Sequence, residues 1–510
     1  MKNSVRYKRR SKRSRAGKRR IAVTVVLVVV ALALWSALRP HARATSEHEA
    51  TAVRIPPVHA PTPRPAAWTA GELADMRADL GHAFAPALSD RYSLAVIDAA
   101  GRVIYARDDD RAVTPASVQK LIVADAALRV LGPHYRFHTV FAAQRAPSSD
   151  GTLEGNLWLV GSGDPSLRSA DLRAGIAALA RAGLRRIDGS IAVDAHEMTG
   201  PEINPHWNPD DANEDFQAPT SAVSIDDDTA EFRVYGGAPG TPARVVVVPA
   251  SHALQMSGAV MTSSSSDSVI IAADAPDVFR LGGTIPQDTE EKFWLPVHDM
   301  PVYAGDVVTA MAREAGITVT GVPVVSNAPL DTTVLWDHRS APLRTLMSHM
   351  LYVSDNHYAE QLMRTLGVDA GGRGSDADGL AAELEFLRSA GIRAPGLRIV
   401  DGSGLADADR VPAITLARVL SDAELDDRGG TQLYQLLPEG GRDGTLTNYD
   451  FTTALGRVRA KTGHLSDADS LAGYVTTRHH GRLAFAFMIN DSPGDPDAAY
   501  VRAVDRLSEF

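Results

Sequence analysis

The chain of 510 residues contains no cysteine. This absence excludes disulfide bonds, zinc sites built on thiolates and a cysteine nucleophile. Lysine is also scarce, because only Lys120, Lys292 and Lys461 follow residue 44, against 36 arginines. Arginine stays protonated, whereas a lysine buried away from water can lose its proton and act as a base. The few lysines therefore indicate positions whose chemistry arginine cannot supply.

The first 44 residues differ in composition from the rest. Residues 1–20 carry eleven Lys or Arg and no acidic residue, and residues 21–38 (IAVTVVLVVVALALWSAL) form an apolar run. This order is typical of an export signal whose basic end stays in the cytoplasm. The run is just long enough to span a bilayer, and Ala42-Arg43-Ala44 is a candidate cleavage site. We expect a periplasmic protein that is either anchored to the inner membrane by residues 21–38 or released by cleavage near Ala44.

Acidic residues dominate after residue 44, with 62 Asp or Glu against 39 Lys or Arg. The basic run at the N-terminus is therefore a topology signal, and a nucleic acid is not an expected partner. Residues 45–67 contain five prolines, which predicts an extended linker between the membrane segment and the folded part of the chain.

A change in pattern divides the remaining chain. Residues 68–136 and 335–510 predict helices mixed with strands, whereas residues 137–334 predict short strands separated by turns rich in Gly, Pro and Ser. Helix and strand patterns on both sides of a β-rich middle indicate an α+β domain, 68–136 plus 335–510. One or more β-rich inserted domains over 137–334 would split it.

Individual elements follow from hydrophobic periodicity and turn residues. A β-hairpin is expected over 93–108, and a helix is expected to follow it, with Thr114 as its cap and Pro115 in its first turn. Further helices are expected over 68–88, 342–353 and 356–367 and from about residue 497, and further strands over 155–163, 231–236, 243–249, 456–463, 470–477 and 482–490.

Ser117 and Lys120 lie three residues apart at the predicted helix start, so their side chains share one face. An unprotonated lysine amine within hydrogen-bond reach can activate a serine hydroxyl for attack on a carbonyl. The helix N-terminus would also favour negative charge that develops near Ser117. The alternative interpretation of this spacing is a capping serine followed by a surface lysine.

Two further short motifs occur later in the chain. Lys461-Thr462-Gly463 closes a predicted strand, where a lysine and a hydroxyl can bind a carboxylate and the glycine lets a substrate backbone approach closely. Ser354-Asp355-Asn356 lies between two predicted helices, where the serine can relay a proton and the asparagine amide can bind a peptide group. Taken alone, the first motif would be a strand leading into a turn and the second a helix cap.

In the order Ser-x-x-Lys, Ser-Asp-Asn, Lys-Thr-Gly, the three motifs resemble the signature of penicillin-binding proteins and serine β-lactamases. The separation of Ser117 from Ser354 is far longer than in compact β-lactamases, which fits a penicillin-binding fold split by an insertion. More of the chain is similar to the D-alanyl-D-alanine carboxypeptidase/endopeptidase family of penicillin-binding protein 4, the S13 serine peptidases. The similar segments are LVGSGDPSL (159–167), residues 207–223 with QAPTSAVS (217–224), DGSGL (401–405), LPEGGRDGTL (437–446) and AKTGHLSDADSLAGYVTT (460–477).

The resemblance implies the groups that perform the reaction. Ser117 would be the acylated nucleophile and Lys120 its general base, while Ser354 would pass a proton toward the leaving amine. The backbone N–H groups of Ser117 and His464 would form the oxyanion hole. His464 stands where this family usually has Thr or Ser, but the backbone N–H is the group that acts.

The resemblance also implies the groups that bind the substrate. Asn356 would hold the penultimate amide, and Lys461 and Thr462 would bind the terminal carboxylate. The family places an aspartate of the insertion near the diamino-acid side chain of the substrate, and Asp211, or nearly as well Asp210, matches it. After DGSGL the chain reads ADADR (406–410) where Ser-Arg is usual, so the side-chain roles there are open.

The function implied is a periplasmic serine D-Ala-D-Ala carboxypeptidase that also cleaves D-amino-acid cross-links in peptidoglycan. It would need no metal or organic cofactor, and β-lactams would acylate Ser117. One alternative is a β-lactamase, although the sequence shows no E-x-x-L-N-like segment that would position a deacylating water. A second alternative is a catalytically silent cell-wall binding protein, against which the retained Ser117, Lys120 and Lys461 argue.

Overall fold

The structure is a computed structural model that describes residues 65–425 and 433–510. The basic segment, the apolar segment, the cleavage site near Ala44 and nearly all of the proline-rich linker lie outside these residues. Within the described ranges, no helix combines the length and the apolar character that a membrane span requires.

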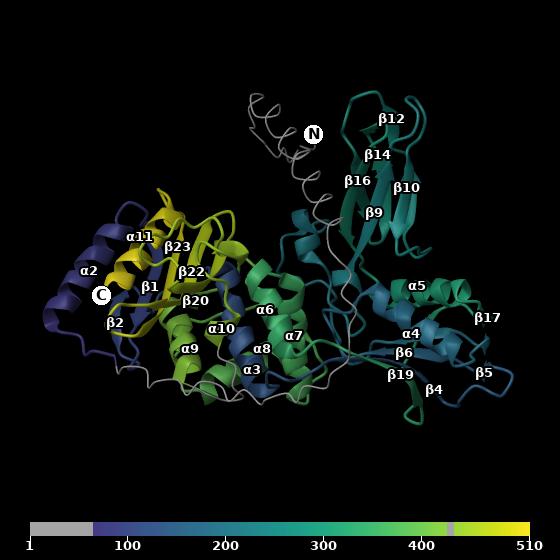
Figure 1. Cartoon of the computed structure of the whole chain (residues 1–510), viewed down its shortest axis with the longest axis horizontal. Helices are drawn as coiled ribbons and strands as arrows, with labels where there is room; N and C mark the ends of the chain where they lie inside the picture. The colour runs from purple at the N-terminus through teal and green to yellow at the C-terminus, as the bar shows by residue number, and fades with distance from the viewer. Residues whose placement is uncertain (1–64, 426–432) are drawn as a thin grey trace, which may run out of the picture. The chain divides into compact units, whose positions relative to one another are not determined.

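A five-stranded antiparallel sheet lies at the centre of the domain that both ends of the described chain build (Figure 1). The expected hairpin and the three expected C-terminal strands are confirmed, and the hairpin pairs with the last strand of the chain. Buried residues run along consecutive positions of these strands, because helices cover both faces of the sheet. The strand order is β2 (Val103–Arg107), β1 (Arg91–Ile97), β23 (Arg482–Asn490), β22 (Ala468–Thr476) and β21 (Val458–His464).

Helices pack on both faces of this sheet (Figure 1). The first and last helices, α2 (Ala70–Phe84) and α11 (Pro496–Glu509), cover one face, while α9 (Ala413–Leu425) and α3 (Lys120–Val130) cover the other. The side chains of Thr69 and Glu72 cap the start of α2 by bonding to free backbone N–H groups. Since every residue of α3 from Lys120 to Leu128 is buried, this helix is a core helix throughout.

Three further helices form a layer beside α3, namely α6 (Leu343–Val353), α7 (Asn356–Asp369) and α8 (Asp376–Ser389). α6 and α7 confirm the helices expected around Ser-Asp-Asn. Ser354 ends α6 with a left-handed backbone of φ 65°, and the Asp355 carboxylate caps α7 by accepting from the backbone N–H of Tyr358. A left-handed residue turns the chain sharply, so the motif is fixed at the junction of two buried helices.

The helix expected to begin at a Thr114 cap begins later. Residues Ala116–Gln119 form a 3-10 turn (η1), and α3 starts at Lys120. Ala116 has φ 51°, in the left-handed region, so a regular helix cannot run through it. Thr114 does not cap the helix: its backbone N–H donates to the side chain of Asn490, and its hydroxyl accepts from Arg410.

The inserted segment contains more helix than its sequence suggested. α4 (Ser169–Arg181) and α5 (Met300–Glu314) pack on a mixed sheet, which makes this part an α/β arrangement. The description of 137–334 as β-rich is therefore incomplete, since Leu172, Ile176 and Leu179 of α4 recur at helical spacing and form its buried face. The strand order is β18 (Val324–Val325), β8 (Ile191–Asp194), β6 (Leu157–Gly161), β4 (His138–Ala143) and β19 (Thr333–Arg339).

The last of these strands lies beyond the expected domain boundary. β19 pairs with β4 in antiparallel register as far as Arg339, so the inserted segment extends past residue 334. The expected strands over 155–163, 231–236 and 243–249 are confirmed as β6, β9 and β10. The remaining elements are β3 (Ala112–Val113) with β20 (Val411–Pro412); β5 (Thr152–Glu154), β7 (Arg186–Asp188) and β17 (Thr318–Val319); β9 (Thr229–Tyr235), β10 (Arg244–Val248) and β16 (Glu290–Pro296); β11 (Gln255–Gly258), β13 (Ile270–Ala275) and β14 (Val278–Gly282); β12 (Met261–Ser263) with β15 (Thr284–Pro286); α10 (Leu433–Leu436); and the 3-10 turns η2 (Pro209–Asp211), η3 (Asp215–Gln217), η4 (Asp226–Asp228) and η6 (Gly444–Leu446).

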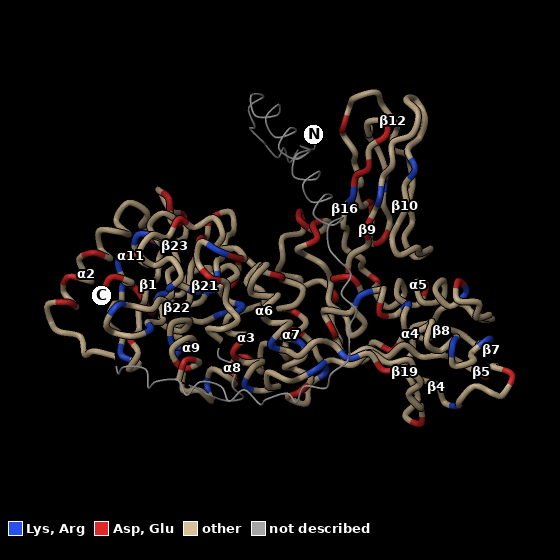
Figure 2. The backbone as a smooth tube through the Cα atoms, in the orientation of Figure 1, with Lys and Arg blue, Asp and Glu red and all other residues tan. Residues whose placement is uncertain are grey.

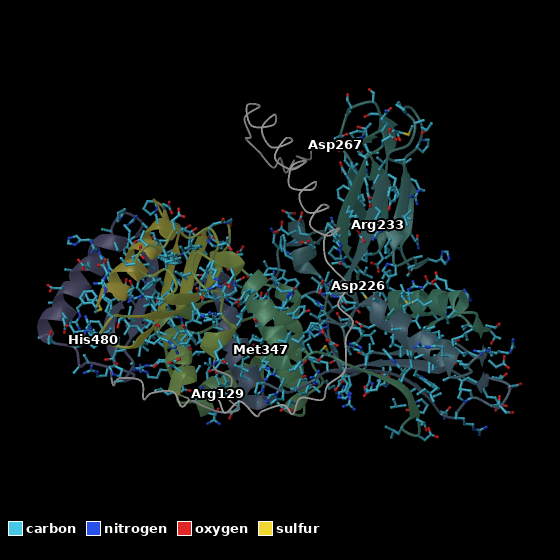
Figure 3. All side chains as sticks on the ribbon, viewed as in Figure 1. Arg129, Asp226, Arg233, Asp267, Met347 and His480 are labelled. Atoms are coloured by element: carbon cyan, nitrogen blue, oxygen red, sulfur yellow. The ribbon has the colours of Figure 1, made fainter. Side chains whose placement is uncertain are left out.

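The start of the described chain is held against the turn between β22 and β23. His480, labelled in Figure 3, stacks on Trp68 with ring centroids 3.8 Å apart. The Nδ1 of His480 donates to the carbonyl of Ala66 over 2.9 Å. Acidic and basic residues are interspersed over the described chain, so neither sign of charge forms a continuous stripe (Figure 2).

Four acidic side chains are buried together beside α7 and α8, and we call Glu360, Glu383, Asp401 and Asp409 the buried acidic cluster. Burial raises the pKa of Glu360, and it raises the pKa of Asp409 to about 10, with the neighbouring Asp401 carboxylate acting in the same direction. Burial also raises the pKa of Glu383 well above its ordinary value, and neither of its oxygens has a hydrogen-bond partner among the described residues. Removal from water therefore favours the neutral form of Glu360, Glu383 and Asp409.

We predict that Glu383→Gln stabilises the protein increasingly as the pH rises. The folded-state pKa of Glu383 lies above its unfolded value near 4.5, so wild-type stability falls as the pH rises from that value toward the folded pKa. A glutamine cannot titrate and avoids this loss. Thermal melts should give nearly equal Tm values at pH 5 and a gain of about 2 °C for the variant at pH 8.

Glu385→Gln on the same helix is the matched control, because the Glu385 side chain is exposed and paired with Arg388. Its Tm difference from wild type should not grow between pH 5 and pH 8. If the Tm difference of Glu383→Gln is equally independent of pH, Glu383 does not have a raised pKa in the folded protein.

Candidate active site

A cavity of about 410 Å³ lies where η1, α7, β21 and the inserted segment meet. Five residues singled out from the sequence line it, namely Ser117, Ser354, Asn356, His464 and Asp211. The others, Lys120, Lys461, Thr462 and Gly463, are held beside its wall by the contacts described below. The remaining lining residues are Asn208, Phe216, Gln217, Gly404, Leu405, Asp407, Leu465 and Ser466.

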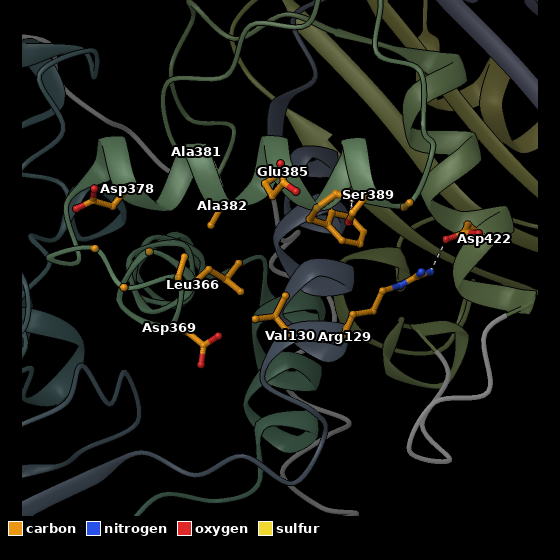
Figure 4. Close-up of a pocket in the computed structure, with 16 residues that line it drawn as sticks. Arg129, Val130, Leu366, Asp369, Asp378, Ala381, Ala382, Glu385, Ser389 and Asp422 are labelled. Atoms are coloured by element: carbon orange, nitrogen blue, oxygen red, sulfur yellow. Dashed lines mark hydrogen bonds and ion pairs between the residues drawn. The ribbon is translucent and has the colours of Figure 1, made fainter.

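A larger cavity, of about 830 Å³, lies between α3, α7, α8 and α9 (Figure 4). Its lining combines small residues with acids such as Asp378, and Arg129 at this cavity forms an ion pair of 2.7 Å with Asp422. None of the residues singled out from the sequence lines it. Because the smaller cavity holds a serine beside a lysine, we assign the chemistry to that cavity.

Ser117 is presented by the short turn η1, which directly precedes α3. The left-handed backbone of Ala116 separates this turn from the preceding strand, and such a conformation in a residue other than glycine is strained by about 1 kcal/mol or more. The three-residue spacing places Lys120 over Ser117, with 3.0 Å between Lys120 Nζ and Ser117 Oγ. A nucleophile and a base are therefore within direct hydrogen-bond reach.

Lys120 Nζ has two other partners, and both are carbonyl oxygens. They are Asn356 Oδ1 at 2.7 Å and the backbone carbonyl of Ser403 at 2.8 Å. A neutral amine has two N–H groups and one lone pair, whereas a carbonyl oxygen can only accept. If Lys120 is neutral, its two N–H groups go to these carbonyls, and its lone pair points at the Ser117 hydroxyl.

The electrostatic surroundings bring Lys120 close to neutrality. The side chain is fully buried, and burial lowers its pKa to about 8. The carboxylates of Asp401, Glu360 and Asp355 act in the opposite direction by favouring the charged amine. A base whose pKa lies near the working pH is well suited to take and return a proton.

Lys461 lies in the middle of β21, beside the cavity wall. Its Nζ donates to Ser354 Oγ over 2.8 Å and to the carbonyl of Thr462 over 2.6 Å. Burial lowers the pKa of Lys461 well below its ordinary value, and the nearby charge of Lys120 lowers it further. Lys461 is thus bonded directly to the hydroxyl of Ser354, which lies at the cavity wall.

Thr462 and Gly463 are packed more tightly than the sequence suggested. The buried hydroxyl of Thr462 donates to Thr445 Oγ1 over 2.8 Å. A Cβ on Gly463 would lie 2.7 Å from the backbone nitrogen of Ser117 and 2.4 Å from Ser470 Oγ. The sequence argument assigned this glycine to the approach of a substrate, but the close approach is made by the backbone that carries Ser117.

Asn356 and Asp211 connect the cavity with the inserted segment. The Nδ2 of Asn356 donates to the carbonyl of Phe216 over 2.9 Å, so both ends of this amide are bonded within the protein. Asp211 lines the cavity and accepts from Asn208 Nδ2 over 2.9 Å. Asp210 is exposed and is not part of the lining.

His464 is part of an ionic group at the end of β21. Its Nε2 lies 3.3 Å from Asp497 and 3.8 Å from Asp469, and the hydroxyl of Tyr449 donates to Asp497 over 2.6 Å. The hydrogen bond with Asp497 raises the pKa of His464 against the effect of burial. Within the described residues, His464, Asp469 and Asp497 are close enough to share a metal ion. The imidazole and the two carboxylates can equally satisfy one another as an ion pair.

Several groups at the site have no counterpart in the sequence argument. The Ser403 carbonyl is a backbone group, so no residue type marks it. Asp401 and Trp207, which support that carbonyl, lie inside segments that were noted only for their family resemblance. Thr445 is the partner of Thr462, and the segment LPEGGRDGTL that contains it was the one available signal.

The chain matches the model of the D-Ala-D-Ala carboxypeptidase 3 (S13) family over residues 80–508. It is 32% identical over 446 residues to a D-alanyl-D-alanine carboxypeptidase of Actinomadura sp., covering 83% of this chain and 82% of that relative. It is 28% identical over 402 residues to D-alanyl-D-alanine carboxypeptidase DacB of Haemophilus influenzae, covering 76% and 83%.

Solved structures show a similar fold. The crystal structure of penicillin-binding protein 4 (dacB) from Haemophilus influenzae matches with a TM-score of 0.74 and 24% identity over 85% of this chain and 99% of that one. A structure of that protein complexed with a novel β-lactam matches with a TM-score of 0.67 and 24% identity over 84% and 97%. The expected α+β fold of the penicillin-binding type is confirmed.

We predict that Gly463→Ala destabilises the protein. The added methyl group would meet the backbone of Ser117 and the Ser470 hydroxyl, which is itself held by a bond of 2.7 Å to the carbonyl of Pro115. Overpacking of this kind costs about 1–3 kcal/mol of unfolding free energy, so Tm should fall by at least about 2 °C.

The matched control is Gly282→Ala in β14, where an added Cβ would meet nothing within 4 Å. Its melting curve should coincide with that of wild type. A normal Tm for Gly463→Ala would show that β21 can move away from Ser117 at no cost.

Proposed function

Since the chain belongs to the D-Ala-D-Ala carboxypeptidase (S13) family, we propose that it removes the terminal D-alanine of peptidoglycan stem peptides through an acyl-enzyme on Ser117. The observation that carries this proposal is the 3.0 Å contact between Lys120 Nζ and Ser117 Oγ at the wall of an accessible cavity. A serine hydroxyl is a weak nucleophile until an adjacent base takes its proton.

In the acylation step, Ser117 Oγ attacks the carbonyl carbon of the penultimate D-alanine while Lys120 takes its proton. Ser117 and His464 line the cavity, and we assign to their backbone N–H groups the stabilisation of the negative oxygen that forms. The C–N bond then breaks, and the terminal D-alanine leaves after its amine gains a proton. We assign delivery of this proton to Ser354, whose hydroxyl is bonded to Lys461; Ser354 regains a proton from Lys120, which holds the one taken from Ser117.

Lys461 and Thr462, which are neighbours in β21, bind the terminal carboxylate of the substrate. Because Lys461 is fully buried, a negatively charged partner that enters the site strongly stabilises its protonated form. An opposite charge within about 4–6 Å favours the protonated amine, which would offset the effect of burial on this lysine. Thr462 adds a hydroxyl on the same strand.

The acyl-enzyme is an ester, and attack by water releases the shortened peptide and frees Ser117. The same reaction cleaves a D,D cross-link when the leaving amine belongs to a second peptide strand, which makes the protein a D,D-endopeptidase as well. A β-lactam presents a strained amide next to a carboxylate, so it acylates the same serine. We place this activity in the periplasm, on the basis of the export signal in residues 1–44, which lie outside the described part of the chain.

The lining of the cavity also favours a cationic side chain. Two carboxylates, Asp211 and Asp407, line the cavity, and no Lys or Arg is among the lining residues. The charge of His464 is already matched by Asp497. We propose that the free amine of the third residue of the stem peptide binds in this cavity near Asp211 and Asp407.

We predict that the protein releases D-alanine from purified muropeptides and splits cross-linked ones, and that Ser117→Ala abolishes both activities. Lys120→Arg should also abolish them, because it retains the charge but cannot act as a base. Mass spectrometry of the products measures both reactions. The two variants should melt like wild type or fall only slightly below it.

Labelling by a fluorescent penicillin separates this function from its alternatives. A long-lived adduct that is absent in Ser117→Ala supports the carboxypeptidase, whereas rapid turnover of penicillin indicates a β-lactamase. Absence of both D-alanine release and labelling in the wild type would favour a catalytically silent cell-wall binding protein.

We predict a preference for a free amine on the third residue of the substrate. Acetylation of that amine should lower kcat/KM about threefold, which is the size expected for exposed charge pairs. Asp407→Arg should remove or reverse the preference. Asp210→Arg is the matched control, because Asp210 is exposed and outside the lining, and it should keep the wild-type preference. Equal effects of the two variants would contradict a local role for Asp407.

A further inference from the structure

The Ser403 carbonyl that accepts from Lys120 belongs to a buried turn, residues 401–404, which we call the 401–404 turn. Asp401 holds this turn closed, because its carboxylate accepts from the backbone N–H groups of Gly404 at 2.6 Å and Ala406 at 2.8 Å. Both Asp401 and Ser403 are completely buried. The position of the carbonyl is therefore set by a carboxylate that does not reach the cavity itself.

The 401–404 turn is fixed on the side of the nucleophile as well. Gln119, the last residue of η1, donates its Nε2 to the Asp401 carbonyl over 2.5 Å. A Cβ on Gly404 would lie 2.1 Å from the carbonyl oxygen of Ala116, so the turn is in direct contact with the backbone next to Ser117. Glu360 on α7 accepts from the backbone N–H of Ser403 over 2.8 Å.

The inserted segment supplies the remaining support. The indole Nε1 of Trp207 donates to Asp401 Oδ2 over 2.9 Å, and both groups are buried. Nearby, Asn204 Nδ2 donates to the carbonyl of Val400 over 2.8 Å. Trp207 and Asn204, both in the inserted segment, thus hold the residues at the start of the 401–404 turn.

We propose that Asp401 and Trp207 are positioning residues for the general base: they fix the Ser403 carbonyl, which takes one N–H of Lys120 and thereby points the lone pair of the amine at Ser117. This inference rests on the proposed role of Lys120 in acylation. It goes beyond that role because it makes the inserted segment a part of the machinery that orients the base, although Trp207 touches neither Ser117 nor the substrate cavity.

The charges around Lys120 give the proposal a second, electrostatic consequence. The groups that face it are Asp355 at the junction of α6 and α7, Glu360 on α7, Asp401 in the turn, and Lys461 on β21. Among the carboxylates, Asp401 has the largest influence in raising the pKa of Lys120. Loss of its charge should therefore lower the pKa of Lys120.

The first test is Asp401→Asn, with the acylation rate by a fluorescent penicillin measured from pH 5 to pH 10. Acylation requires neutral Lys120, so the rate rises with pH through the pKa of this lysine. In the variant this rise should move to lower pH by about one unit, and the plateau rate should fall because the amide cannot accept all the bonds made by the carboxylate.

The second test is Trp207→Phe, which keeps the charge of Asp401 and removes one hydrogen bond from it. The plateau rate should fall at least about tenfold with the rise at its wild-type pH, because a small displacement of a catalytic group is enough to slow the reaction. Trp158→Phe is the matched control: Trp158 is buried in β6, and its Nε1 has no hydrogen-bond partner among the described residues. It should be acylated at the wild-type rate.

The outcomes separate this inference from the proposed function. If the wild type is acylated but Trp207→Phe behaves like Trp158→Phe, Trp207 does not position the base, and the inference is overturned. If Asp401→Asn folds and its acylation rate rises at the same pH as that of the wild type, Asp401 does not raise the pKa of Lys120. If Asp401→Asn does not fold, the result for Trp207→Phe alone tests the inference. Failure of the wild type to be acylated at all would overturn the proposed function together with the inference.

Discussion

The amine of Lys120 is the point on which the rest of the site depends. It lies among three acceptors, the Ser117 hydroxyl, the Asn356 amide oxygen and the Ser403 carbonyl, which come from three separate parts of the chain. Only the hydroxyl can also donate, so the other two determine the direction of the lone pair. An amine in water would exchange such partners freely. Complete burial is therefore what turns a common residue pair into a directed base.

Burial also disfavours positive charge at this site, so other groups have to compensate for it. Two lysines, Lys120 and Lys461, are fully buried at one site, and each disfavours a positive charge on the other. The compensation is distributed: Asp401, Glu360 and Asp355 favour a charge on Lys120, while the approach of a substrate carboxylate favours one on Lys461. The substrate carboxylate therefore favours a positive charge on Lys461, while burial keeps the pKa of Lys120 low enough for this lysine to serve as a base. Under the proposed function, this arrangement would favour substrates with a free C-terminal carboxylate through electrostatics.

Sequence reasoning reached the fold class and the short motifs, because both depend on local patterns. The order of Ser-x-x-Lys, Ser-Asp-Asn and Lys-Thr-Gly named residues that the fold places at or beside one cavity, and the hairpin over 93–108 and the last three strands follow from plain alternation. It did not reach features that depend on distant contacts. The Thr114 cap failed because Ala116 is left-handed. The helices of the inserted segment were missed although Leu172, Ile176 and Leu179 of α4 recur at helical spacing. The roles of the Ser403 carbonyl and Trp207 exist only once residues 194 or more apart in the chain are in contact.

The inserted segment therefore contributes directly to the structure around Lys120 and the cavity. It donates to Asp401 through Trp207, accepts from Asn356 through the carbonyl of Phe216, and brings Asp211 to the cavity. The first contact acts on the turn that carries the Ser403 carbonyl, the second acts on Asn356, which accepts from Lys120, and the third lies at the cavity proposed to take the substrate. A displacement of this segment would change the orientation of the base and the electrostatics of the entrance together. Because both depend on the same stretch of chain around residues 207–216, the proposed substrate recognition and the proposed activation of Ser117 would be physically coupled.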